Sequence, residues 1–205
     1  MRRLSGKNGA AALTLLLAAF GLFQLGGGAW IYAKAALAKT LIADAWDETL
    51  QGGVKIRPWP WADTWPVAKL GFPTRNRQTT VLAGANGAML AFGPGHLDGT
   101  APPGESGHTL IAGHRDTSFT VLSDLAQGDP VRLQTADGSW HDYRVTGTAV
   151  VDARNPWTPP VPGPAGSMLT LMTCWPLDAL VAGGPMRYLV FAERGRSTDT
   201  RFSAR

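Results

Sequence analysis

The feature that most constrains the fold is a series of seven short apolar or β-branched runs, separated by turns rich in glycine and proline. Such runs are typical of strands, because β-branched and aromatic side chains pack well on a pleated surface. They occupy residues 67–72, 79–83, 108–112, 130–134, 140–151, 167–173 and 185–192. Asp137-Gly138, between two of the runs, is a strong hairpin signal. The sequence therefore predicts a mostly β domain, built as an antiparallel-rich barrel or sandwich without long helices.

An uncharged segment of 25 residues, Gly9 to Ala33, precedes this region between Lys7 and Lys34. As a helix rising about 1.5 Å per residue, it is long enough to cross a hydrocarbon core of about 30 Å. Ala33-Lys34-Ala35 also fits a signal-peptide cleavage site, but the uncharged run is longer than a usual signal-peptide core. We therefore expect an uncleaved, single-pass transmembrane helix.

Basic residues before this segment predict its orientation, because positive charges favour the cytoplasmic side of a membrane. Arg2, Arg3 and Lys7 place the amino terminus in the cytoplasm. The remainder of the chain is then expected on the periplasmic side of the inner membrane, or in an equivalent extracytoplasmic space.

Residues 34–56 are expected to form a helical stalk or linker. Their apolar residues recur at intervals of three and four, which is the helical period. The apolar stripe consists of Ala38, Leu41, Ile42, Ala45, Trp46 and Thr49. Gln51-Gly52-Gly53 ends the predicted helix, because glycine is common just after a helix. The expected organisation is a cytoplasmic terminus (1–8), an anchor (9–33), the stalk (34–56), a β domain (57–194) and a disordered tail (195–205).

The composition excludes several classes of protein. Of 205 residues, 44 % are hydrophobic and 17 % are charged, which is typical of a globular chain. The net charge of +4 comes without a basic stripe, so we expect no nucleic-acid partner. A single cysteine cannot form an internal disulfide. Residues 57–66 contain three Trp and three Pro; they suit an interfacial anchor or a lid, but packing of the indoles across one end of the barrel is favoured.

The only cysteine, Cys174, follows an apolar run, and Pro176 ends the strand because proline has no N–H to donate. A lone cysteine is often an inert core residue. Here, however, His114 follows a second apolar run and Arg187 stands near the start of a third. Thiol acyl transfer requires a nucleophile, a group that gives and takes protons, and a donor that stabilises the oxyanion. We expect Cys174, His114 and Arg187 to supply these three roles.

The residues Thr170-Leu171-Met172-Thr173-Cys174 fit the Thr-Leu-x-Thr-Cys motif of sortases, the cysteine transpeptidases that anchor proteins at the cell surface. Sortases carry a histidine on a strand well upstream of the cysteine and an arginine about a dozen residues after it. His114, Cys174 and Arg187 follow one another in this order and with separations that suit it. The resemblance covers about residues 60–194.

Two further segments refine this resemblance. Gly113-His114-Arg115 resembles the histidine motif of several sortase classes, and Arg57–Asp63 in a short chain is most similar to the class GN sortases of Gram-negative bacteria. The resemblance implies an eight-stranded β barrel with short helices, preceded by the transmembrane helix. It also implies a transpeptidase that cleaves a carboxyl-terminal sorting motif of a secreted partner protein, holds it as a thioester on Cys174, and transfers it to an amine acceptor in the cell envelope without a cofactor.

Residues around these three are expected to bind substrate or support the site. By resemblance, the proline-rich loop 153–166 walls the substrate groove, and Thr173, Ala112 and Trp157 are expected to contact the substrate. We expect no metal site, because no carboxylate or second cysteine completes a ligand set around the histidines. Asp116 and Asp152 are each candidates to orient His114, or to pair with Arg115, which is expected at the surface.

Three alternatives stay open from the residues alone. An L,D-transpeptidase normally has a histidine two residues before its cysteine, where this chain has Met172. A cysteine peptidase of the papain type places its nucleophile at the start of a helix, which Pro176 and Gly183-Gly184 disfavour here. A membrane-anchored β barrel without catalytic activity, with Cys174 as a core residue, is the third.

Overall fold

The computed structural model describes residues 6–155, 166–179 and 183–195. The chain forms two compact units, Met1–Thr40 and Leu41–Arg205. Helix α1 (Gly6–Leu50) supplies the described part of the first unit and continues into the second. Among the described residues, it is the one helix whose length and mean hydropathy of 1.8 suit a membrane span, and its apolar window is not buried.

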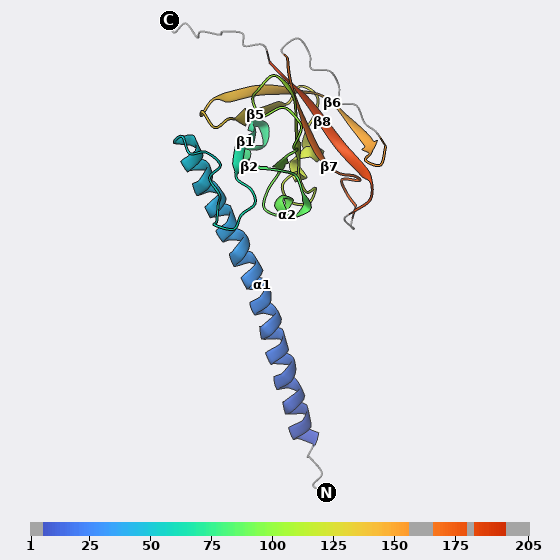
Figure 1. Ribbon diagram of the computed structural model, residues 1–205. Coiled ribbons are helices and arrows are strands. Elements are labelled where there is room, and N and C mark those ends of the chain that lie inside the picture. The colour runs from blue at the N-terminus through green and yellow to red at the C-terminus, as the bar shows by residue number, and fades with distance from the viewer. Residues whose placement is uncertain (1–5, 156–165, 180–182, 196–205) are drawn as a thin grey trace, which may run out of the picture. The chain divides into compact units, whose positions relative to one another are not determined.

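The second unit contains a closed barrel of eight strands (Figure 1). The strands are β1 (Pro66–Phe72), β2 (Arg77–Ala83), β3 (Gly95–His96), β4 (Gly107–Ala112), β5 (Pro130–Gln134), β6 (Trp140–Asp152), β7 (Ser167–Cys174) and β8 (Met186–Arg194). Their order around the barrel is β1-β2-β3-β4-β7-β8-β6-β5, and β5 pairs with β1 to close it. The short helical segments are η1 (Pro73–Arg75), α2 (Gly87–Leu90) and η2 (Thr120–Asp124). The prediction of a mostly β, eight-stranded barrel is confirmed.

Strand β3 is the element that the sequence did not predict. It has only two residues, and none of the seven predicted strand runs includes Gly95 or His96. It nevertheless pairs in parallel with β2 and antiparallel with β4, and so it bridges the two. Gly95 is required for this close approach, because a Cβ built there would lie 2.1 Å from the carbonyl oxygen of Gly84.

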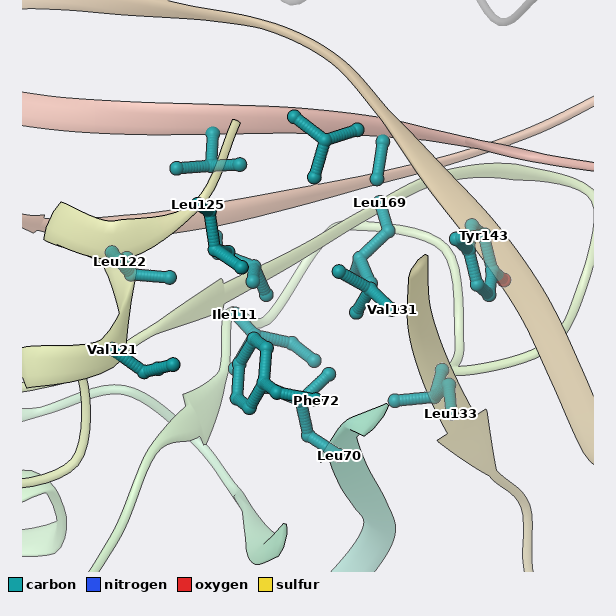
Figure 2. Close-up of a cluster of buried hydrophobic side chains, with 14 of the residues drawn as sticks. Leu70, Phe72, Ile111, Val121, Leu122, Leu125, Val131, Leu133, Tyr143 and Leu169 are labelled. Carbon is teal, nitrogen blue, oxygen red and sulfur yellow. The ribbon is translucent and has the colours of Figure 1, made fainter. Parts of the chain in front are cut away.

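The barrel interior is filled by apolar side chains from nearly every strand. Figure 2 shows these side chains converging from opposite walls. They include Leu70, Phe72, Ile111, Val131, Leu133, Tyr143 and Leu169 from the strands, with Val121 and Leu122 from η2. Phe119, just before η2, is fully buried and would collide with a Cβ at Gly113. The core therefore reaches the turn that follows β4.

The last turns of α1 belong to the barrel unit. Ile42, Ala45, Trp46 and Thr49 are buried, as the apolar stripe predicts, and the Lys69 ammonium of β1 lies 6.0 Å from the Trp46 ring. The helix ends where the sequence predicts: Gly52 has a φ of 98°, and Gly53 N–H donates to Glu48 while Gly52 N–H donates to Thr49. This pair of bonds is the Schellman arrangement, which satisfies carbonyls at a helix end. The compact unit thus begins at Leu41, within the predicted stalk.

The Trp- and Pro-rich segment packs in part as expected. Trp59 makes an edge-to-face contact with Phe92 at 5.0 Å, and the Lys55 ammonium lies 5.1 Å from the Trp65 ring. Trp61 differs, since 79 % of it is exposed. Two of the three indoles therefore pack against neighbouring side chains.

The hairpin between β5 and β6 forms at the predicted turn. Val131 pairs with Tyr143, and Gly138 adopts a φ of 82°. The Asp137 carboxylate accepts hydrogen bonds from the Thr135 hydroxyl, and from the backbone N–H and hydroxyl of Ser139. These bonds, that of Thr135 first, lower the pKa of Asp137 to about 2.

The lowered pKa of Asp137 predicts a pH-dependent contribution to stability. A depressed folded-state pKa stabilises the fold at neutral pH, and this contribution is lost as the pH falls from the ordinary value of 3.8 through about 2. We expect Asp137→Ala to lower the Tm at pH 7 by a few degrees and to differ less from wild type at pH 3. Thermal unfolding followed by circular dichroism measures both differences; an equal or larger difference at pH 3 would contradict the assignment.

Candidate active site

The pairing of β4 with β7 brings His114 to Cys174. The two strands are parallel, and every pair from Gly107↔Ser167 to Ala112↔Met172 keeps the same offset in sequence. Gly113 N–H extends the pairing by donating to the carbonyl of Met172 at 3.0 Å. His114 and Cys174 are separated by this same offset, which therefore brings the histidine to the level of the cysteine at the carboxyl ends of adjacent strands.

The antiparallel pairing of β7 with β8 brings Arg187 to the same place. Cys174 lies directly opposite Arg187 in the register. Trp175 N–H donates to the Met186 carbonyl at 3.1 Å, so the Cys174/Arg187 pair falls at the alternate, non-hydrogen-bonded position. Side chains at such positions approach most closely, with Cα atoms about 4.5 Å apart. The structure therefore brings together all three residues predicted to act in catalysis.

The Arg187 guanidinium is held beside the active site by the loop that precedes β8. Its Nη1 donates to the carbonyls of Gly184 at 2.8 Å and Met186 at 2.9 Å. The side chain is half-buried, and Nε and Nη2 carry three further N–H donors. Such a fork suits a carbonyl oxygen on which negative charge develops.

Strand alternation divides β7 into two faces. Leu169 and Leu171 belong to the core, so Thr173 points to the core side, while Met172 and Cys174 share the other face. Ala112 lies beside Met172 in the register and is buried. This arrangement places Ala112 on the same face of the sheet as Cys174. Its role in substrate binding stays a prediction.

Thr173 makes a contact different from the one predicted. It is 2 % exposed, and its hydroxyl donates to the carbonyl oxygen of Gly113 at 2.8 Å. The residue before the nucleophile is thereby tied to the residue before the histidine. A role for Thr173 in substrate binding stays a prediction, and Trp157 lies outside the described residues.

The two aspartates proposed to orient His114 are both engaged by arginines. Asp152 accepts from Arg154, and this bond first of all lowers the pKa of Asp152 to about 2. Asp116 accepts from Arg115 through both carboxylate oxygens, and these bonds are the main cause of its lowered pKa. The charge of His114 lowers that pKa further.

The expectation that Arg115 lies at the surface is wrong. Its side chain is 6 % exposed, although it pairs with Asp116 as the sequence suggested. Besides that pair, Nη1 donates to the carbonyl of Pro176 at 2.7 Å. Nothing in the sequence marks this contact, because the two residues are 61 positions apart and the acceptor is a backbone atom.

The remaining histidines have structural contacts. His108 Nε2 lies 2.7 Å from the Thr170 hydroxyl, and burial lowers the pKa of His108. His96 Nε2 lies 3.0 Å from the Thr100 hydroxyl. In the described part of the chain, no three His, Cys, Asp or Glu side chains form a possible metal site. A hollow of about 710 Å³ at the opposite end of the barrel, lined by His96 and His141 among others, contains none of the three catalytic candidates.

Comparison with known proteins identifies the family of the chain. The model of the sortase domain family matches residues 70–195. Sortase D of Bacillus subtilis (strain 168) is 29 % identical over 125 residues, covering 61 % of this chain and 62 % of that protein. The chain thus spans less than two thirds of the length of this relative.

Solved sortase structures share the fold. Sortase A from Corynebacterium diphtheriae matches with a TM-score of 0.55 and 28 % identity, over 68 % of this chain and 65 % of that one. A Clostridium perfringens sortase D5 transpeptidase matches with a TM-score of 0.56 and 20 % identity, over 78 % and 99 %, which supports the fold alone. These relatives are named sortase A and D, and they lend no support to the predicted likeness to class GN.

Sortases are cysteine transpeptidases that act on proteins with carboxyl-terminal sorting signals. The sortase model covers more than half of the chain, and the barrel matches solved sortases. The chain therefore belongs to the sortase family.

Proposed function

We propose that the protein is a membrane-anchored cysteine transpeptidase that uses Cys174 as its nucleophile. The observation that carries this proposal is the pairing of β7 with a strand on each side, β4 and β8, at its carboxyl end. One neighbouring strand brings His114 to the level of Cys174, and the other places Arg187 opposite it. Three residues from three separate segments of the chain are brought to one end of the barrel, in the order and with the chemistry of the family.

In the proposed first half-reaction, Cys174 gives its thiol proton to His114, and the thiolate attacks the carbonyl carbon of a peptide bond in the sorting motif. The C–N bond breaks, a thioester forms, and His114 gives a proton to the departing amine. Arg187 donates hydrogen bonds to the carbonyl oxygen, whose negative charge is largest in the tetrahedral intermediate. Its backbone anchors at Gly184 and Met186 hold the guanidinium near this position before substrate arrives.

In the proposed second half-reaction, an acceptor amine of the cell envelope attacks the thioester carbonyl. His114 takes the proton from that amine, and the Cys174 thiolate leaves. The new amide joins the secreted partner to its acceptor. The exposure of His114 suits this role, because both amines must reach it.

The proposal also covers the substrate contacts, the membrane anchor and the sortase class. Ala112 and Met172 would form the floor of a substrate groove on the face of Cys174, whereas the predicted contact residue Trp157 lies outside the described residues. The uncharged part of α1 would anchor the enzyme in the inner membrane, with the barrel on the periplasmic or equivalent side. Membership of class GN is a further prediction, based on residues 57–63 and the short chain.

The alternatives from the sequence are less well supported. A papain-type peptidase would carry its cysteine at a helix start, whereas Cys174 is the last residue of a strand. An L,D-transpeptidase is disfavoured by the sortase family match. A barrel without catalytic activity is excluded if Cys174 forms an acyl intermediate, which is directly measurable.

Cys174→Ala is expected to abolish the acyl intermediate while the barrel still folds, because loss of one thiol leaves only a small cavity. The wild-type protein is incubated with a library of carboxyl-terminal peptides from secreted proteins, and intact mass spectrometry detects a thioester adduct that hydroxylamine removes. The same adduct or normal turnover in Cys174→Ala would rule out this mechanism.

Arg187→Lys is expected to reduce kcat/KM by about 10²–10³, since lysine keeps the charge but lacks the planar fork. His114→Ala should be at least as damaging, because neither amine would then have a positioned proton partner. Arg132→Lys is the matched control: Arg132 is exposed and pairs with Asp142 on the β5–β6 hairpin. Near-wild-type turnover by Arg187→Lys would remove this residue from the proposed mechanism.

Membrane anchoring predicts that the full-length chain stays in the membrane pellet after high-salt and alkaline washes. A chain that begins at Leu41 should be soluble and folded, since it retains the compact unit. A chain that begins at Gly53 lacks the buried Trp46 and should be less stable by about 3–5 kcal/mol. Mature protein that begins near Ala36 would instead indicate a cleaved signal peptide.

A further inference from the structure

The side chain of Arg115 is a buried charge between the two segments that carry the nucleophile and the histidine. A charged side chain is almost never fully buried unless it is paired. Arg115 is 6 % exposed, and its guanidinium forms a two-point pair with Asp116, with Nε–Oδ1 at 2.6 Å and Nη2–Oδ2 at 3.0 Å. The third bond, from Nη1 to the Pro176 carbonyl at 2.7 Å, joins Arg115 to a residue 61 positions away in the sequence.

This third bond joins the segment that contains His114 to the segment that contains Cys174. Arg115 directly follows His114, and Pro176 is the second residue after Cys174. On the other side of the nucleophile, the Thr173 hydroxyl donates to the carbonyl of Gly113, the residue before His114. Cys174 is thus bracketed by two side chain–backbone bonds, and each joins the cysteine segment to a residue next to His114. Past the last strand pair, these bonds hold the two segments in register.

The Arg115 guanidinium also interacts with charged groups on the segment that carries Cys174. The pKa of Arg115 is raised mainly by its hydrogen bond to Asp116, and further by the negative charges of Cys174 and Asp178.

We propose that Arg115 is a positioning residue: it clamps the segment after Cys174 to the turn that carries His114, and so sets the distance between thiol and imidazole. This inference rests on the proposed function for its effect on catalysis, but the clamp itself is a property of the fold. Arg115 does not touch the substrate in this scheme, which separates its role from that of Arg187.

Arg115→Lys is the direct test, because lysine keeps the positive charge but cannot form the pair with Asp116 and reach Pro176 in one planar geometry. We expect kcat, divided by the amount of Cys174 that iodoacetamide titrates, to fall about 10- to 100-fold. KM should change less than about threefold, because substrate contacts are unchanged. Arg132→Lys, another Arg–Asp pair on the same barrel, should leave both constants unchanged.

Hydrogen–deuterium exchange tests the clamp without substrate. In full-length Arg115→Lys, amide exchange should rise both in residues 113–118 and in residues 175–179, and should stay at the wild-type level in β1 and β5. Asp116→Asn, at an exposed position that does not endanger folding, should give a smaller rise in the same two segments. It frees the guanidinium from its two-point partner but leaves the bond to Pro176 possible.

These outcomes test the Arg115 clamp separately from the proposed transpeptidase function. Unchanged exchange in 175–179 in both variants overturns the clamp, as does a general rise that includes β1 and β5. A kcat per titrated Cys174 within twofold of wild type also overturns it. If wild-type protein forms no acyl intermediate with any peptide but both segments loosen together in Arg115→Lys, the clamp stands and the transpeptidase function fails.

Discussion

The parallel pairing of β4 with β7 is the constraint on which the site depends. A parallel pair needs a long crossover, and here the crossover contains η2, β5 and β6, which make up much of the barrel. The constant sequence offset between paired residues then fixes which side chain of one strand lies level with which of the other. If β7 slipped by one residue against β4, the Cys174 sulfur would point to the core, and a different residue would lie level with His114.

Much of the fold and the three catalytic candidates could be predicted from the sequence, for a clear physical reason. Strand runs such as 130–134 and 140–151 carry their own pattern, and the Asp137-Gly138 turn demands backbone angles that glycine supplies. Cys174 and His114 can be identified as catalytic candidates because each stands at the end of an apolar run. A nucleophile at the end of a buried strand meets solvent where backbone pairing stops.

What the sequence could not predict was contacts that depend on backbone geometry. Strand β3 consists of two residues and exists because Gly95 permits a close approach to Gly84. The sequence suggested a surface position for Arg115. An adjacent Asp116 can pair with an arginine that is exposed as well as with one that is buried, so the pair does not reveal that Arg115 is buried. Its second acceptor is the Pro176 carbonyl, and no side-chain pattern encodes a carbonyl. The bond from the Thr173 hydroxyl to Gly113 could not be predicted for the same reason, since its acceptor is also a backbone carbonyl.

The place of β8 in the chain has a consequence for how such a protein matures. It is the last strand of the barrel along the sequence, and it fills the gap between β7 and β6. Until it docks, β7 has an unpaired edge and Cys174 has no arginine opposite it. A chain that folds as it emerges, amino end first, therefore carries an accessible thiol without the group proposed to stabilise the oxyanion. Closing the barrel would then also complete the proposed catalytic set, so the topology itself would keep an incompletely folded molecule inactive.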